Sequence, residues 1–325
     1  DGTNYNVAVG FRSMYTNTTG DYNAAVGYQA LYSNTTGINN SAFGYSALYS
    51  NTTGTSNIAI GGQSMYSNSG GVQNTAVGYN ALYTNKTGNT NVAVGRDAMY
   101  SSDSTYYNTA IGFQAMRTTT TGDSNTAVGY NALYSNTTGA FNTAFGRQAL
   151  YTNSVATWNT AVGYQSLYST TNNSNVAIGT FSGSGITAGY QNTVVGYNAG
   201  TTANMTGYNN TLVGYNAQLS VATAINTITL GDANIATLRC QVTTITALSD
   251  MRDKTNIENI PVGLDYIREL RPVKFDWNTR DGSRQGRKEF GFIAQDLDEV
   301  ETKFGYSEYT RIVHKENLDK WEADA

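Results

Sequence analysis

A serine hydroxyl and a lysine amine lie five residues apart in the segment 249–254, which has the sequence Ser-Asp-Met-Arg-Asp-Lys. Serine is a poor nucleophile at neutral pH, so an adjacent base must take its proton. Lysine can be that base where burial or a neighbouring cation lowers its pKa, and Arg252 is a candidate neighbour. The segment therefore allows a Ser/Lys dyad of Ser249 and Lys254. From these residues alone, the alternative stays open that Ser249 and Asp250 cap a turn or helix and that Lys254 is a solvated surface charge.

The composition of the chain changes close to this segment. Residues 1–231 carry five acidic and five basic side chains, whereas residues 232–325 carry 18 acidic and 14 basic ones. Neither part has the basic stripe that nucleic-acid binding requires. The sequence has no apolar run long enough to span a membrane and no signal peptide. We therefore predict neither a nucleic-acid partner nor a membrane partner.

Metal and disulfide chemistry are disfavoured by the residue types present. The chain has one cysteine, Cys240, and one histidine, His314. A single cysteine excludes an intrachain disulfide framework, and the pair is too few for a Cys/His zinc site. We predict no metal and no cofactor, and we interpret His314 as a strand histidine near the surface rather than a catalytic base.

The first 231 residues are a repeat marked by glycines at 10, 27, 44, 61, 78, 95, 112, 129, 146, 163, 179, 196, 214 and 231. The period is 17, with slips of one residue only in the last units. Fourteen copies of a short fixed period predict a solenoid, in which each unit stacks on its neighbours.

Each repeat unit predicts two strands joined by a glycine corner. The residue before the glycine is Val, Ile, Phe or Leu, and the residue two before it is Ala in the first eleven units. A strand points these two side chains to opposite faces, and the small face suits either a coil interior or an oligomer axis. A Leu or Met followed by Tyr, such as Leu31 and Tyr32, lies four residues after the glycine and predicts a second short strand.

Asparagines lie four residues before the glycine in thirteen of the fourteen units, Asn23 and Asn40 among them. Stacked in parallel coils, these amides are expected to form a ladder that satisfies corner backbone groups. Many units close with Asn-Thr-Thr-Gly, in which Asn and Gly suit the positive φ of a tight turn. The Tyr row is interpreted as a packing ladder, with carbohydrate binding as an alternative. Ice binding by the Thr rows is a further alternative.

Three motifs in order carry a family resemblance. They are Ser249-Asp250 with Arg252, Lys254, Asn256 and Ile257; then residues 270–277, Leu-Arg-Pro-Val-Lys-Phe-Asp-Trp; then residues 291–297, Gly-Phe-Ile-Ala-Gln-Asp-Leu. Together they resemble the C-terminal intramolecular chaperone domain of phage tail spikes and fibres, the S74 peptidase family. The resemblance implies that this domain assists trimerisation of a β-rich fibre and then releases itself.

The same resemblance implies residue roles at the cut. Cleavage falls between Leu248 and Ser249, with Ser249 as the nucleophile, Lys254 as the base and Asp250 completing the Ser-Asp pair. The family usually continues into a further helix, so we expect the domain to be truncated at its C-terminus.

The repeat has a second, shorter resemblance. The phrases Asn-Ile-Ala-Ile-Gly at 57–61 and Asn-Val-Ala-Ile-Gly at 175–179 resemble the repeat of trimeric autotransporter adhesin heads of the YadA type, whose repeat is shorter than 17 residues. This resemblance implies a trimer of left-handed parallel β-rolls. A single-chain solenoid stays open on periodicity alone.

We thus predict a mostly β protein with three parts. Residues 1–231 form a parallel β-solenoid or β-roll of 17-residue repeats, trimeric and left-handed; residues 232–248 form a connecting strand; residues 249–325 form a small α+β chaperone and autoprotease domain. Within the last part, helices are expected at 263–270, ended by Pro272, and at 294–300, and strands at 273–277 and 289–293.

The predicted function is a trimeric phage tail fibre or adhesin shaft for host attachment, located in the virion or at the cell surface. Its expected partners are its own copies and a host-surface glycan or receptor. The alternative is a bacterial surface adhesin or a glycan-binding or ice-binding repeat protein. An enzymatic repeat is disfavoured because isolated charges offer no acid/base pair.

Overall fold

The computed structural model describes residues 5–237, 263–276 and 288–304. The chain divides into two compact units, Asp1–Arg239 and Cys240–Ala325. Each unit is described by itself below. In the described ranges, no helix is both long and apolar enough to cross a membrane.

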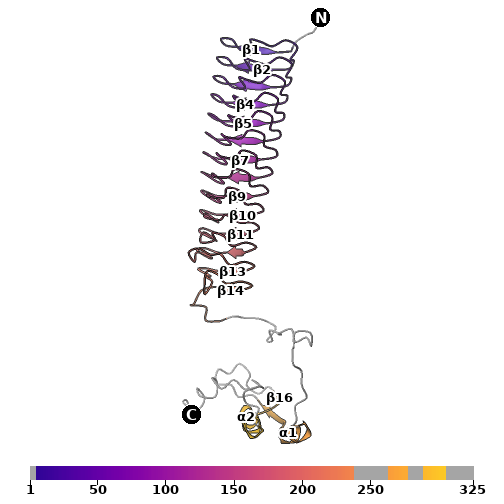
Figure 1. Cartoon of the computed structure of the whole chain (residues 1–325), viewed down its shortest axis with the longest axis vertical. Helices are drawn as coiled ribbons and strands as arrows, with labels where there is room; N and C mark the ends of the chain where they lie inside the picture. The colour runs from indigo at the N-terminus through magenta and orange to yellow at the C-terminus, as the bar shows by residue number, and fades with distance from the viewer. Residues whose placement is uncertain (1–4, 238–262, 277–287, 305–325) are drawn as a thin grey trace. The chain divides into compact units, whose positions relative to one another are not determined.

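The first unit is a β-solenoid built on one parallel sheet (Figure 1). Its fourteen strands lie side by side in chain order, which confirms the predicted parallel solenoid with 17-residue spacing. The trimeric state and the left-handed sense stay predictions. The strands are β1 Val7–Val9, β2 Ala24–Val26, β3 Ser41–Phe43, β4 Ile58–Ile60, β5 Thr75–Val77, β6 Val92–Val94, β7 Thr109–Ile111, β8 Thr126–Val128, β9 Thr143–Phe145, β10 Thr160–Val162, β11 Val176–Ile178, β12 Thr193–Val195, β13 Thr211–Val213 and β14 Ile228–Leu230.

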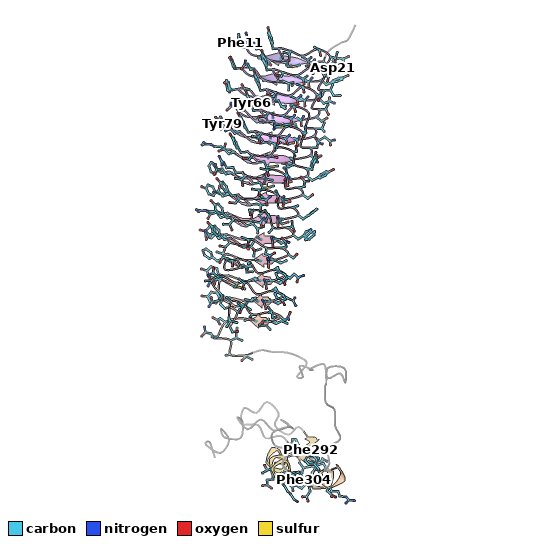
Figure 2. The ribbon with its side chains drawn as sticks, in the orientation of Figure 1. Phe11, Asp21, Tyr66, Tyr79, Phe292 and Phe304 are labelled. Atoms are coloured by element: carbon cyan, nitrogen blue, oxygen red, sulfur yellow. The ribbon has the colours of Figure 1, made fainter. Side chains whose placement is uncertain are left out.

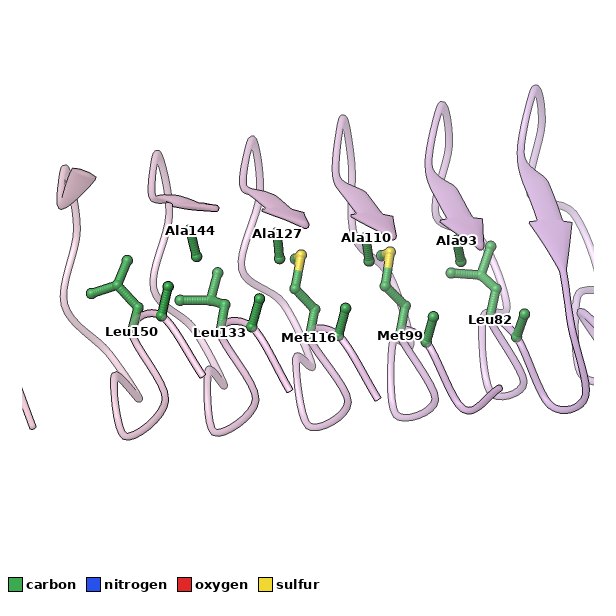
Figure 3. Packing of buried hydrophobic residues seen from close by; sticks show 14 of the residues in the cluster. Leu82, Ala93, Met99, Ala110, Met116, Ala127, Leu133, Ala144 and Leu150 are labelled. Carbon is green, nitrogen blue, oxygen red and sulfur yellow. The ribbon is translucent and has the colours of Figure 1, made fainter. Parts of the chain in front are cut away.

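The solenoid core contains the small face of each strand. Ala25 of β2 pairs with Ala42 of β3, and both are fully buried. Opposite each strand alanine, the Leu or Met four residues after the glycine fills the coil, as Leu82 and Met99 do in Figure 3. The small strand residues therefore line the interior of the coil and do not lie at an oligomer axis.

The predicted second strand is wrong. The residues after each glycine corner form consecutive turns, in which Gly27, Gln29 and Leu31 have positive φ and the residues between them do not. Left-handed backbone costs a non-glycine residue about 1–2 kcal/mol. The cost is offset because these amides bond neighbouring coils: the N–H of Gln29 donates to Phe11 O at 2.8 Å, and that of Leu31 to Ala47 O at 2.9 Å. Ala30 and Leu31 are both fully buried, so two consecutive side chains enter the core, which the alternation of a strand does not allow.

The prediction of positive φ in the Asn-Thr-Thr-Gly turns is also wrong. Gly37 and its equivalents do not have positive φ, and in this part of the coil the positive φ lies two residues later, as at Asn39. Glycine is needed at Gly37 because a Cβ there would lie 2.5 Å from Gly54 O of the next coil and would also overlap Asn34 Oδ1. Close coil stacking, and not a left-handed turn, selects this glycine.

The described part of the second unit contains two helices and a strand pair. Helix α1 spans Gly263–Glu269 and helix α2 spans Ala294–Lys303. Strands β15 (Val273–Asp276) and β16 (Lys288–Gly291) pair antiparallel. This confirms the α+β character and the order helix, strand, strand, helix.

Candidate functional site

Two buried asparagine ladders hold the solenoid coils in register. In the predicted ladder, Asn23 Oδ1 accepts from Asn40 N at 2.9 Å and from Asn40 Nδ2 at 3.1 Å, and Asn40 Nδ2 also donates to Gly54 O at 2.8 Å. The second ladder was not predicted: Asn51 Nδ2 donates to Asn34 Oδ1 at 2.8 Å and to Gly54 O at 3.1 Å. Its sequence signal is the Asn that opens each Asn-Thr-Thr-Gly phrase. Both ladders are structural, because their buried amides bond one another and backbone groups of neighbouring coils.

The outward side of the sheet, which we call the strand face, consists of the first and third residues of β1–β14. None of these strands contains a charged residue. The third residue is always Val, Ile, Phe or Leu, and many are well exposed, including Phe43, Ile60 and Ile111 at 40–42%. The strand face is therefore a long apolar surface within the described solenoid.

Two aromatic rows run along the coils beyond the glycine corner. The first row follows each glycine directly and contains Phe11, Tyr28, Tyr45, Tyr79, Phe113, Tyr130, Tyr164, Tyr197 and Tyr215. The second row lies four residues further on and contains Tyr15, Tyr32, Tyr49, Tyr66, Tyr83, Tyr100, Tyr134, Tyr151 and Tyr168. Figure 2 shows Phe11, Tyr66 and Tyr79 projecting from the same side of the solenoid, with Asp21 on the other side.

The ring geometry of the second row is that of a packing ladder. The Tyr32–Tyr49 and Tyr49–Tyr66 centroids are both 5.0 Å apart, with interplanar angles of 6° and 4°. Each ring thus uses both faces on its neighbours and offers solvent only its edge. A sugar that stacks on an aromatic face finds no free face inside such a row, which weakens the carbohydrate-binding alternative.

Burial in this ladder also affects the tyrosine hydroxyls. It raises the pKa of Tyr49, Tyr83 and Tyr151 above the ordinary 10.0, and the neighbouring tyrosines of the row raise these pKa values further. The hydroxyls concerned hold their protons more tightly in the folded solenoid.

Arginines take the place of rings in the aromatic rows. The Arg147 guanidinium lies 5.5 Å from both the Tyr130 and the Tyr164 centroids, and Arg96 lies 6.0 Å from Tyr79 and 5.9 Å from Phe113. A planar guanidinium stacks on aromatic faces as a ring does. The aromatic side of the solenoid therefore carries charged groups, with Arg96 paired to Asp97 at 3.5 Å, whereas the strand face carries none.

The first threonine of each turn pair is engaged with the next coil. Thr35 Oγ1 donates to Thr52 O at 3.0 Å, and Thr52 Oγ1 donates to Ser69 O at 2.9 Å. These hydroxyls serve coil stacking, whereas the second threonines, such as Thr36 and Thr53, are exposed.

In the second unit, ion pairs join the two helices and the β15 connection. Arg271 Nε and Nη2 donate to Asp296 Oδ2 at 2.9 and 2.6 Å, and Lys303 Nζ lies 2.7 Å from Glu269 Oε1. The Tyr266 and Phe304 rings meet edge to face at 5.6 Å. The Asp296 side chain is 35% exposed, so solvent still reaches its pair with Arg271.

A comparison with known families accounts for this unit. Residues 249–306 match the family described as the chaperone of endosialidase, peptidase S74. The match contains α1, β15, β16 and α2 and begins at Ser249. It confirms the resemblance drawn from the three sequence motifs. No curated protein and no solved structure matches the chain. We call residues 249–306 the chaperone segment.

The predicted catalytic residues of the chaperone segment lie outside the described residues. These are Ser249, Asp250 and Lys254, together with Leu248 on the other side of the predicted cut, and His314 lies outside as well. Their roles stay predictions. No group of three or more potential metal ligands occurs among the described residues.

Proposed function

We propose that the chain is the shaft of a phage tail fibre or tail spike, followed by a chaperone segment that helps the shaft assemble as a trimer and then cuts itself free. The observation that carries the proposal is a chaperone segment beginning at residue 249, which follows in sequence a β-solenoid whose last strand, β14, ends at Leu230. A parallel solenoid exposes an unpaired strand edge at each end of the growing stack while it folds, which gives a temporary folding aid a physical role.

The proposed cut is a single turnover within one chain. Lys254 takes the Ser249 hydroxyl proton, and Ser249 Oγ attacks the Leu248 carbonyl carbon. The Leu248–Ser249 C–N bond breaks, the Ser249 nitrogen receives the proton, and an ester remains on Oγ. Water then hydrolyses the ester, which leaves a Leu248 carboxylate and a Ser249 with free hydroxyl and amine. Intramolecular attack replaces substrate binding by proximity.

The shaft itself is proposed to act in host attachment, in the virion tail, with a host-surface glycan or receptor as its partner. Support for this step comes only from the tail-protein character of the chaperone segment. The asparagines bond inside the coils and the tyrosine rings stack on one another, so neither row by itself is proposed as the receptor site. The proposal assigns receptor binding to the outer surface of the solenoid.

Expression of the full chain followed by intact-mass analysis tests the cleavage. Wild type is expected to give two fragments, 1–248 and 249–325, and the smaller one to begin Ser-Asp-Met-Arg. Ser249→Ala is expected to remain whole, and Lys254→Met to be cut at least ~100-fold more slowly. Thr246→Ala, which removes a hydroxyl just upstream, is the matched control and should be cut like wild type. An assembled wild type that stays whole, or a Ser249→Ala chain that is cut equally fast, would refute the proposal.

A further inference from the structure

We propose that the strand face is the surface on which copies of this chain pack against one another, side by side, parallel and in register. The inference deepens the proposed function, because it assigns the assembly of the shaft to one defined surface of the solenoid. It concerns residues that point away from the coil interior, such as Val77, Val94 and Ile111.

The composition of the strand face calls for a covering partner. It presents a continuous row of Val, Ile, Phe and Leu from β1 to β14, beside a row rich in Thr and Val, without one charged residue. Soluble monomers rarely expose a contiguous apolar patch larger than a few hundred Å². At the strand spacing of about 4.8 Å and the rise of about 3.3 Å per residue, fourteen three-residue strands span roughly 650 Å².

This area approaches what a stable interface needs. Specific interfaces bury about 800 Å² on each partner. The roughly 650 Å² of the strand face is about four-fifths of that area. The strand face alone thus comes close to the size of a specific interface.

The regular spacing of the strand face indicates that its partner is a second copy of the same chain. The units that end at Gly179 and Gly214 have 16 and 18 residues and depart from the period, yet β10 and β11, and β12 and β13, stay aligned residue for residue. The length changes fall between Leu167 and Asn175 and between Ala199 and Asn210, in the turns. The chain varies elsewhere but keeps this face straight and periodic over all strands. A second copy has the same rise per coil and can match it along its full length.

Charge distinguishes this face from the aromatic side. In a closed cyclic assembly, copies arranged around an axis bring the same residue of each copy to the same height. Uncharged apolar rows can meet their own copies without penalty. The aromatic side cannot, because Arg12, Arg117 and Arg147 would approach their own like charges there. The strand face therefore faces the axis, and the arginines and tyrosines lie outside.

Sedimentation velocity tests the surface, with Ser249→Ala in every chain so that each stays whole. With this change alone, the protein is expected to sediment as a small multiple of the chain mass. The triple variant Phe43→Lys, Ile60→Lys and Ile111→Lys is expected to sediment at the mass of one chain while keeping the β circular-dichroism spectrum. The matched control places three lysines on exposed turn threonines of nearby coils, Thr36→Lys, Thr53→Lys and Thr121→Lys, and should keep the larger mass.

Disulfide trapping tests both surface and register, and it holds even where the lysine variant fails to fold. In a Cys240→Ser background, oxidised Ile111→Cys is expected to give a covalent dimer, whereas Thr121→Cys is not. Mixing Ile60→Cys chains with Ile111→Cys chains should give no mixed dimer, because three coils separate these residues by roughly 14 Å and a disulfide needs Cα atoms within about 7 Å.

The outcomes separate this inference from the proposed cleavage. A folded Ser249→Ala protein that sediments as one chain, a lysine variant that keeps the larger mass, or trapping at Thr121→Cys instead of Ile111→Cys overturns the inference. Ice-growth inhibition by such a single chain would assign the face to ice and overturn it equally. Trapping at Ile111→Cys in a chain that is never cut sustains the inference and counts against the cleavage alone.

Discussion

The solenoid and the chaperone segment obtain their order in different ways. In the solenoid, a coil is held by the coil before and the coil after it, through strand pairs, buried asparagines and stacked rings. In the described part of the chaperone segment, exposed ion pairs such as Arg271–Asp296 and an edge-to-face ring pair connect the elements. Because the same few contacts recur in every coil, a nearly uncharged chain forms a long core although each contact contributes little stability.

This difference makes the solenoid a one-dimensional structure in energetic terms. Each coil contacts only its neighbours, so damage at one coil interrupts the whole stack at that point. The chaperone segment is not built from stacked repeats, so a weakened contact there is expected to destabilise only that small unit. Substitutions at matched sites can measure the contrast.

The largest effect is expected where backbone packs on backbone between coils. A Cβ at Gly95 would lie 2.7 Å from the carbonyl carbon of Gly112, and Gly95 has φ +132°. Gly95→Ala should destabilise the solenoid by roughly 3 kcal/mol or more in denaturant unfolding followed by circular dichroism. At Gly70 the nearest atom to an added Cβ is Thr53 Oγ1 at 3.4 Å, so Gly70→Ala should change stability by less than about 1 kcal/mol. Equal effects of the two substitutions would contradict the close coil stacking.

A break in the predicted asparagine ladder should cost nearly as much. Asn57 Oδ1 accepts from Asn74 N at 3.0 Å, and Asn57 Nδ2 donates to Gly71 O at 2.7 Å. Asn57→Ala leaves both buried backbone groups without these partners and should destabilise the solenoid by about 3 kcal/mol. Thr53→Ala, at an exposed site in the preceding turn, is the control, and its effect should stay within about 0.5 kcal/mol.

The corresponding loss in the chaperone segment should be smaller and confined to that unit. The Arg271 side chain is 69% exposed and its Asp296 partner 35%, so solvent screens the pair. Arg271→Ala should lower stability by less than about 1 kcal/mol and leave the solenoid transition unchanged. A shift of the solenoid transition by Arg271→Ala would show that the two units unfold together.

The features that could be predicted from the sequence are those in which the same residue type recurs at one position of each 17-residue repeat. The strand alanines, the corner glycines and the first asparagine ladder all belong to this class. Asn34 and Asn51 of the second ladder also recur every 17 residues, but the Asn-Thr-Thr-Gly phrase that contains them fits an isolated tight turn equally well. Only the stacked structure shows that these asparagines form a ladder and not separate turns.

Other features could not follow from local preference. Leucine and methionine rarely adopt positive φ, yet Leu31 and Met65 do so because their amides bond the next coil. An exposed strand face also looks like a buried one in sequence, since both are rows of Val and Ile. For the chaperone segment, three separated motifs sufficed to predict the family, while the geometry of Ser249 and Lys254 stays a prediction.

Restoring a ladder should stabilise the solenoid by a moderate amount. Ser102 and Thr105 replace the Asn and Gly of the second ladder, their hydroxyls bond each other, and Asn85 Oδ1 is left without a partner. The double variant Ser102→Asn and Thr105→Gly supplies a donor for Asn85 and should add about 1 kcal/mol. Ser102→Asn alone should not gain this stability, because the new amide oxygen would overlap the Cβ of Thr105. In neighbouring coils, the equivalent amide oxygen occupies the space that a Cβ on the turn glycine would need. Comparison of the single and double variants by thermal unfolding measures the coupling, and a single variant as stable as the double would contradict it.

The smallest expected effect is the response of the tyrosine ladder to alkaline pH. Burial, and then the neighbouring tyrosines, raise the pKa of Tyr49, Tyr83 and Tyr151 above the ordinary 10.0. The folded solenoid therefore binds these protons more tightly than the unfolded chain, so their contribution to stability is complete below that pH and is lost as pH rises above it.

Replacing Tyr49, Tyr83 and Tyr151 by Phe keeps the rings stacked and removes the titrating hydroxyls. The melting temperature of the variant should fall less steeply than that of wild type as the pH rises above about 10, with little difference between the two at pH 7. Melting curves of both chains across this range provide the measurement. Parallel curves would mean that the ladder holds its coils together through ring contact alone, and that the alkaline sensitivity of the solenoid arises at other groups.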